Sequence, residues 1–373
     1  MTVPICIDDP INRRILAVSE DMVQGFQRDP IGVICERSGV DVDTVIHRIR
    51  AMLDAGTIRR VRQTLMSTKL APGALVAWRV STRHLDAAFN WMFQRDPFSG
   101  HVVIRSTDKD SAGAEYRLWT TLKIPQGYCM TRHCEYLRGQ TGAEDYIVLP
   151  AKKLFALGVG HVRRRGLVPG IRTDEPARTI DVELVELDKR QWQVLMALKR
   201  DFHSEEIMVN LWQGRAKGAG VRLEEFYLIA EELCRLGIIG RFSTFLEHAK
   251  KLADGTMVAK YNALFHWAVP PGREMDAGME VGRHVCMTHA YWREGGAAFN
   301  HVNIMGVVHG LDRQVVLDHK AAVDEHLREQ GIPLHYSNVF WGGRSEIKPS
   351  EVSPIAYRQW CDHQGIDPEA MRT

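Results

Sequence analysis

The feature that most constrains this chain is an internal repeat. Residues 220–242 align on residues 39–61 without a gap, at a constant offset of 181. The clearest matched pairs are Val45 and Phe226, Leu53 and Cys234, Gly56 and Gly237, and Arg60 and Arg241. A repeated segment of this kind indicates a duplicated structural unit, so the two halves of the chain are expected to fold alike.

The repeated segment is typical of a helix-turn-helix followed by a strand. A helix over 42–55 has a good N-cap in Asp41 and stops at Gly56. A shorter helix over 30–38 precedes it, and residues 57–61 read as a strand. Two short helices and a strand in this order predict a winged helix-turn-helix.

The stretch after each helical segment predicts the element order β-α-β-β-α-β. This order occurs over residues 74–150 and again over 261–340, and it is typical of a ferredoxin-like domain. The fold class is therefore α+β, with two tandem repeats of a winged helix-turn-helix and a ferredoxin-like domain. We expect the two ferredoxin-like sheets to pack as a pseudo-two-fold pair, as separate subunits would in a dimer.

These patterns divide the chain into six parts. The expected parts are a winged helix-turn-helix at 1–65, a ferredoxin-like domain at 66–160, a linker at 161–187, a second winged helix-turn-helix at 188–250, a second ferredoxin-like domain at 251–348 and a tail at 349–373. The linker opens with His161 and three arginines, which are expected to form a solvated face or to touch an anionic ligand. The tail has no role that its residues indicate.

Candidate functional residues gather in residues 281–310. His289, Tyr291 and Arg293 share one face of an extended strand, because side chains alternate along a strand. A second strand ends at His309-Gly310, and hairpin pairing would let His289 and His309 line one cavity. Such a cavity suits a flat, polyanionic, metal-bearing ligand, since arginine binds carboxylates and imidazole binds iron. The alternative is an edge hairpin with a solvated polar face.

Motifs in both halves resemble those of one enzyme family. T-H-A-Y-W-R and V-N-I-M-G-V-V-H-G resemble the S-H-C-Y-x-R and Y-N-L-F-T-M-I-H-G signatures of the second subunit of sirohaem decarboxylase. Y-R-L-W-T-T-L-K-I-P and V-L-P-A-K-K-L-F-A-L-G-V resemble motifs of the first subunit. The chain therefore resembles both subunits fused in order, and the family has the architecture of Lrp/AsnC regulators.

The resemblance implies an activity and roles for named residues. Members of the family remove CO2 from two acetate side chains of sirohaem, giving didecarboxysirohaem in haem biosynthesis. The macrocycle delocalises the electron pair, so no cofactor separate from the iron tetrapyrrole is expected. Expected catalytic residues are His289, Tyr291 and Arg293; expected substrate-binding residues are Arg105, Arg241, Asn303 and His309; candidate iron ligands are His289 and His309.

One strand departs from the family pattern. Where the first subunit has T-H-N-Y-x-R, this chain reads H-V-V-I-R-S-T-D-K-D. We interpret Arg105 as the one retained equivalent, with the His and Tyr lost and His101 lying four residues earlier. One catalytic pocket, in the second half, is therefore expected rather than two.

Composition and charge restrict the other functions. The formal net charge is +2, and the second candidate recognition helix, 222–236, carries four glutamates that DNA would repel. We therefore do not expect DNA to be the main ligand, and we interpret both helical units as a dimerisation scaffold. The competing hypothesis is a tetrapyrrole-binding sensor or regulator of the Lrp/AsnC type, without turnover.

The remaining composition predicts the cellular setting. No apolar run is long enough for a membrane helix, and the N-terminus lacks the features of a signal peptide. Seven scattered cysteines indicate reduced thiols and a cytoplasmic protein, and the Cys129–Cys134 cluster is interpreted as packing. We expect a pseudo-dimer within one chain, with a further homodimer as an option, and no membrane partner.

Overall fold

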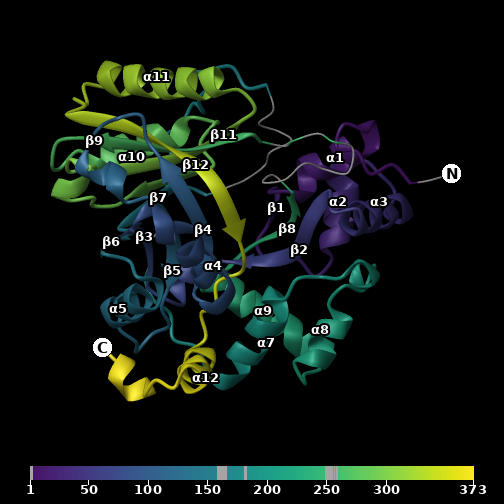
Figure 1. The fold of residues 1–373 in the computed structure, drawn as a ribbon. Helices are drawn as coiled ribbons and strands as arrows, with labels where there is room; N and C mark the ends of the chain where they lie inside the picture. The colour runs from purple at the N-terminus through teal and green to yellow at the C-terminus, as the bar shows by residue number, and fades with distance from the viewer. Residues whose placement is uncertain (1–2, 158–165, 180–182, 248–254, 256, 258) are drawn as a thin grey trace. The chain divides into compact units, whose positions relative to one another are not determined.

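The protein forms two compact units, each built from both halves of the sequence. The computed structural model describes residues 3–157, 166–179, 183–247, 255, 257 and 259–373 (Figure 1). In this part of the chain, the helix unit comprises residues 3–66, 185–247, 255 and 257, and the sheet unit comprises residues 67–157, 166–179, 183–184 and 259–373. The predicted linker falls partly outside the described residues, because His161 and its three arginines are not among them.

The helix unit contains short helices whose ends are set by caps. Asp9, Asp29 and Asp41 each accept hydrogen bonds from the first backbone N–H groups of the helix that follows. Gly56 and Gly237, which match in the repeat, both have positive φ angles, of 76° and 70°, after their helices. The elements are α1 (Pro10–Ser19), β1 (Val23–Gln24), α2 (Pro30–Ser38), α3 (Val42–Asp54), β2 (Ile58–Leu65), α7 (Lys189–Lys199), α8 (Gln213–Gly218), α9 (Leu223–Arg235) and β8 (Ile239–Leu246).

The strands of both sequence halves share one sheet in the helix unit. β2 and β8 pair antiparallel, and β1 adds to the other edge of β8, giving the order β1-β8-β2. The strands that follow the matched helices, β2 and β8, are therefore paired directly with each other.

The sheet unit repeats one element order twice. Its first set is β3 (Gly73–Arg79), α4 (Leu85–Arg95), β4 (Ser99–Ser106), β5 (Leu118–Lys123), α5 (Met130–Thr141), β6 (Asp145–Pro150) and β7 (Lys153–Leu157). Its second set is β9 (Tyr261–Ala268), α10 (Glu274–Arg283), β10 (His289–Trp292), β11 (Ile304–Gly310), α11 (Arg313–Glu329) and β12 (Tyr336–Ile347). We call β6-β3-β5-β4 the first half-sheet and β12-β9-β11-β10 the second half-sheet.

Strands β12 and β7 connect the two sequence halves within the sheet unit. β12 pairs with β9 through residues 336–342 and with β4 through residues 341–347, with an irregularity between Gly342 and Ser345. β7 follows β6 after two residues and pairs with β10. The expected packing of two separate sheets is thus incomplete, because one antiparallel nine-stranded sheet runs through both.

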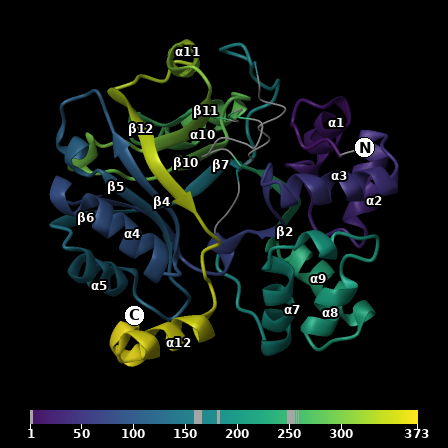
Figure 2. The same cartoon turned by 45° about the vertical axis from the view of Figure 1, so that its right-hand side comes forward.

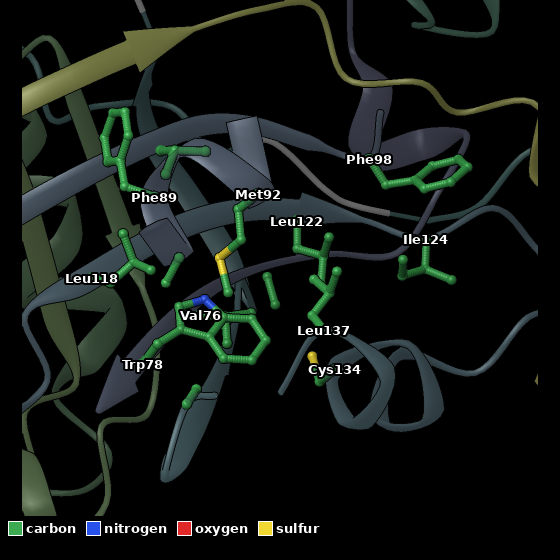
Figure 3. Close-up of a cluster of buried hydrophobic side chains, with 14 of the residues drawn as sticks. Val76, Trp78, Phe89, Met92, Phe98, Leu118, Leu122, Ile124, Cys134 and Leu137 are labelled. Carbon is green, nitrogen blue, oxygen red and sulfur yellow. The ribbon is translucent and has the colours of Figure 1, made fainter. Parts of the chain in front are cut away.

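Three apolar cores lie in layers across the sheet unit. The first, in Figure 3, packs the first half-sheet against α4 and α5 and contains Trp78, Phe89 and Leu137. The second packs the other half-sheet against α10 and α11. The third includes Trp119 of β5 and Phe340 of β12, so the inner faces of the two half-sheets pack on each other. Figure 2 shows α4 and α5 on the outer side of the first half-sheet.

The C-terminal tail completes the first core. α12 (Pro354–Gln364) begins at the cap Ser353 and buries Tyr357, Trp360 and Cys361 in that core. The Tyr357 hydroxyl lies 2.9 Å from Nδ1 of His133, which is fully buried on α5. The tail therefore has a packing role that its sequence did not indicate.

Two further observations concern the cysteines and the helices. All seven cysteines are free thiols, and Cys134 packs in the first core. Across the described part of the chain, every helix is too short or too polar to cross a membrane.

Candidate functional site

β10 and Arg293, the residue directly after it, place three predicted site residues in a row on the inner face of the second half-sheet. The rings of His289 and Tyr291 have centroids 6.0 Å apart and lie 13° from parallel. The Cζ atom of Arg293 lies 4.6 Å from the centroid of the Tyr291 ring, a cation–π contact. Ala290 between them points into the second core and is fully buried. The alternation of side chains along a strand therefore produces the expected row.

β11 brings the second predicted histidine close to this row through a threonine. In the antiparallel register His289 pairs with Val307, so His309 lies two residues further along β11. Thr288 Oγ1 lies 3.2 Å from Nδ1 of His289 and 3.4 Å from Nδ1 of His309. The two imidazoles therefore share one hydroxyl group.

A second set of contacts connects His309 to the first half-sheet. Asn262, on β9, has Nδ2 3.2 Å from Nε2 of His309. Its Oδ1 accepts a hydrogen bond of 3.3 Å from Nη1 of Arg105, on β4. Three predicted residues, His289, His309 and Arg105, on three different strands, thus belong to one hydrogen-bonded polar network with Thr288 and Asn262.

The sequence interpretation missed both linking residues. Thr288 is adjacent to His289, and Asn262 lies with His266 on the largely apolar strand β9. Alternation along β9 places Asn262 on the same face as His266, so the polar period of that strand was the available signal.

Arg105 and Arg293 are buried cations on the inner faces. Their relative exposures are 4% and 8%, and burial lowers the pKa of each guanidinium to about 10. Arg105 donates to the Phe340 carbonyl at 3.3 Å, and Arg293 donates to the Leu149 carbonyl, so each reaches the opposite half-sheet. Among the described residues, neither forms an ion pair with a carboxylate, which leaves both charges without an anionic partner.

Burial also affects Tyr291. Desolvation raises the pKa of Tyr291, while the positive charge of Arg293 opposes that rise. The phenol is therefore protonated at neutral pH and can donate a hydrogen bond.

Two other predicted residues have structural contacts. The Asn303 amide bonds both the N–H and the C=O of Val269, at 2.9 Å each, and so holds the start of β11 to the end of β9. Arg241 lies on β8 in the helix unit, where its Nε donates to the Glu20 carbonyl at 3.2 Å. Neither contact involves the residues of the polar network.

The inner face of the second half-sheet holds two further buried polar side chains. His266 is fully buried against the rings of Trp119, Phe299 and Phe340. Within the described structure, neither of its ring nitrogens has a hydrogen-bond partner. Burial, followed by the charge of Arg105, lowers its pKa to about 3, so the ring is neutral. Asn338, its partner across β12, is also buried.

The first half-sheet has an equivalent of the β10 row. The backbone N–H of Arg105 donates to the Arg117 carbonyl at 2.7 Å, as that of Arg293 donates to the Asn303 carbonyl at 3.0 Å. Both bonds lie at the same end of the hairpin between the second and third strands. Arg105 and Arg293 are therefore equivalent in the two half-sheets.

Because Arg105 and Arg293 are equivalent, the prediction that the first half had lost its histidine is wrong. His101 occupies the position of His289, and Val103 occupies the position of Tyr291, as the strand registers require. In both strands the arginine comes four positions after the histidine, so this spacing identifies His101 as the equivalent of His289. His101 Nε2 lies 2.8 Å from Oγ of Ser345.

A surface pocket of 320 Å³ lies elsewhere, within the helix unit. Arg59, Arg60, Asp201 and His203 are among its lining residues. Charges of both signs line it, and it contains none of the predicted site residues, so it does not resemble a site for a polyanion.

Comparisons with known proteins agree with this architecture. Residues 71–156 match the family model of the AsnC-like ligand binding domain. The crystal structure of the siroheme decarboxylase NirDL matches with a TM-score of 0.65 and 17% identity, over 95% of this chain and 98% of that one. Its co-complex with an iron-uroporphyrin III analogue matches with a TM-score of 0.63 and 16% identity, over 95% and 99% of the two chains. None of the curated protein sequences matches this chain.

These matches concern the fold. The chain has the fold of siroheme decarboxylase over nearly its whole length, and residues 71–156 match the AsnC-like ligand binding domain. The resemblance predicted from the motifs is therefore confirmed at the level of the fold.

Proposed function

We propose that the protein is a carboxy-lyase of the sirohaem decarboxylase type, which removes CO2 from acetate side chains of sirohaem or a related iron tetrapyrrole. The observation that carries this proposal is the pair of buried guanidinium groups, Arg105 and Arg293, without carboxylate partners among the described residues. A polycarboxylate substrate would supply the missing negative charge and relieve the cost of burying these cations. His289 and Tyr291 beside Arg293 add an iron ligand or proton carrier and a hydrogen-bond donor.

The chemistry divides between the substrate and these residues. The bond between the methylene carbon and the carboxylate breaks, CO2 leaves, and the electron pair stays on the methylene carbon, delocalised into the macrocycle. A proton then converts the methylene carbon to a methyl group. The buried site desolvates the carboxylate, Arg293 holds it, Tyr291 donates a hydrogen bond, and His289 ligates the iron or delivers the proton.

The architecture that goes with this function is a fused pair. We infer two tandem repeats, each a winged helix-turn-helix followed by a ferredoxin-like domain, with the six divisions given above, acting as a pseudo-dimer in one cytoplasmic chain. The equivalence of Arg105 and Arg293 supports this inference, because each donates to a backbone carbonyl of the opposite half-sheet. Didecarboxysirohaem would be the product, on the path to haem.

The second candidate function is a tetrapyrrole-binding sensor without turnover. The match of residues 71–156 to a ligand-binding domain favours it. A DNA-binding regulator is disfavoured, since α9 has Glu224 and Glu231 within 2.9 Å and 2.6 Å of Arg28 and a DNA phosphate would meet those carboxylates. Nanomolar, sequence-selective duplex binding at physiological salt would support the regulator.

Anaerobic incubation of the purified protein with sirohaem, followed by mass analysis of the extracted pigment, tests the proposal. Loss of one and then two CO2 units from the pigment is the expected result. Tight binding, seen in the absorption spectrum, with the pigment recovered unchanged would replace the enzyme with the sensor.

A further inference from the structure

We propose that Thr288, His309 and Asn262 are positioning residues that fix the imidazole of His289 with its proton on Nδ1. The tautomer is argued from hydrogen bonds alone; its use in decarboxylation rests on the proposed function. One series of hydrogen bonds runs from Arg105 through Asn262, His309 and Thr288 to His289.

The Thr288 hydroxyl can only accept from the two imidazoles. Its single proton goes to the Val307 carbonyl at 2.9 Å, because a carbonyl oxygen has no proton to donate. The Nδ1 atoms of His289 and His309, at 3.2 Å and 3.4 Å, must therefore be the donors. A hydroxyl oxygen has two lone pairs, so it satisfies both rings.

The hydrogen bonds from Arg105 and Asn262 also indicate that the proton of His309 is on Nδ1. A guanidinium group has donors only, so the bond from Arg105 Nη1 fixes which end of the Asn262 amide is the oxygen. Nδ2 of Asn262 then faces Nε2 of His309 at 3.2 Å and donates to it. An Nε2 that accepts is unprotonated, which agrees with the proton that Thr288 places on Nδ1.

The two histidines therefore take different parts. Both ring nitrogens of His309 are engaged, Nε2 by Asn262 and Nδ1 by Thr288, so this residue holds the network rather than binding iron. His289 has its proton on Nδ1, so its lone pair is on Nε2, the form that ligates iron or accepts a proton.

The first half-sheet cannot build the same chain. Gly100 precedes His101 where Thr288 precedes His289, so the shared hydroxyl is absent there. Gly73 and Lys123 pair on β3 and β5 at the positions of Asn262 and His309. The tautomer of His289 is thus set in one half only, with Arg105 of the other half as the first donor.

Nitrogen NMR of the protein without pigment tests the tautomer directly. We would label the 16 histidines with ¹⁵N and assign His289 and His309 from the His289→Gln and His309→Gln variants. Both residues are expected to show a protonated Nδ1 and an unprotonated Nε2. Free histidine prefers the Nε2–H form, so a signal of that form for His289 would overturn the proposal.

Substitutions of Thr288 and Asn262 distinguish a positioning role of these residues from a general effect on folding. Thr288→Val is expected to move the His289 tautomer ratio roughly two- to tenfold toward Nε2–H, the effect of one hydrogen bond, and Thr288→Ser to restore it. Asn262→Asp, which cannot donate, is expected to move the His309 proton to Nε2. The control is Thr120→Val, which removes a buried hydroxyl from β5 that accepts from Trp78 Nε1 at 2.9 Å. Equal shifts in this control would count against the proposal.

Pigment conversion in the same variants distinguishes this inference from the proposed function. If the parent has the expected tautomers but never converts sirohaem, the function fails and the tautomer stands. If the parent converts sirohaem while His289 is in the Nε2–H form, the function stands and the inference fails.

Discussion

The two half-sheets share a backbone plan but differ in the chemistry of their inner faces. The matched positions, first half before second, are His101 and His289, Val103 and Tyr291, Arg105 and Arg293, Ala77 and His266, Ile147 and Asn338, and Gly73 and Asn262. Histidine and arginine recur, whereas four positions that are apolar or glycine in the first half are polar in the second. The histidine and arginine therefore belong to the backbone plan that both half-sheets share. The polar residues at the other four positions occur only in the second half-sheet and identify it as the candidate site.

Exchange of histidine for alanine in each half gives the largest expected difference. His289→Ala should slow single-turnover pigment conversion by about 100- to 10,000-fold, the range of a lost acid–base group. The tautomer argued above makes a shifted Soret band the expected sign of a lost iron ligand. His101→Ala is the matched control and should retain most of the rate. A greater loss in His101→Ala would transfer the active site to the first half.

The two arginines should separate binding from rate. Arg293→Ala should weaken pigment binding by about 10- to 150-fold, as the loss of one charged hydrogen bond implies. Arg105→Ala should affect the conversion rate less. Pigment titrations and single-turnover kinetics measure these effects. Abolished conversion in Arg105→Ala alone would reverse the assignment.

Tyr291→Val converts the second row into the pattern of the first. We expect conversion to slow by about two- to tenfold, because one hydrogen-bond donor is lost while His289 and Arg293 remain. Single-turnover kinetics at saturating pigment measure the change. An unchanged rate would show that the difference from Val103 has no catalytic meaning.

His266 occupies the position that Ala77 has in the first half-sheet. Its titration should lower the free energy of unfolding at acid pH and have little effect at neutral pH. Its pKa is about 3 when folded and near 6.5 when unfolded, so the unfolded chain binds the extra proton. Its contribution is fully present above pH 6.5 and falls as the pH drops toward 3. His266→Leu should reduce the pH slope of the unfolding free energy by up to one proton, about 1.4 kcal/mol per pH unit. An unaltered slope between pH 4 and 6 would contradict this assignment.

Local signals in the sequence predicted the helices and strands. They did not predict which strands pair over long distances in the chain. The helices over 30–38 and 42–55 were predicted from caps and end within a residue of the structure. The row of His289, Tyr291 and Arg293 followed from alternation along one strand. Thr288 and Asn262 were missed because their role depends on the register among β9, β10 and β11, which no local pattern fixes.

The crossover of β12 was also beyond local patterns. β12 has twelve residues and pairs with two strands, β9 and β4. Its pairing with β4 has an irregularity in register between Gly342 and Ser345. Its partners β4 and β9 are far apart in the chain, so turn chemistry and period carry no information about the pairing.

The crossing strands have a consequence for how the chain is made. While the protein emerges from the ribosome, β4 has no neighbour for its outer edge until β12, near the end of the chain, has been synthesised. Until then the nascent chain carries an open strand edge of the kind that invites aggregation or exchange between molecules. Covalent fusion of the halves keeps the correct partner strand on the same molecule, whereas two separately synthesised halves would have to find each other before either sheet was closed.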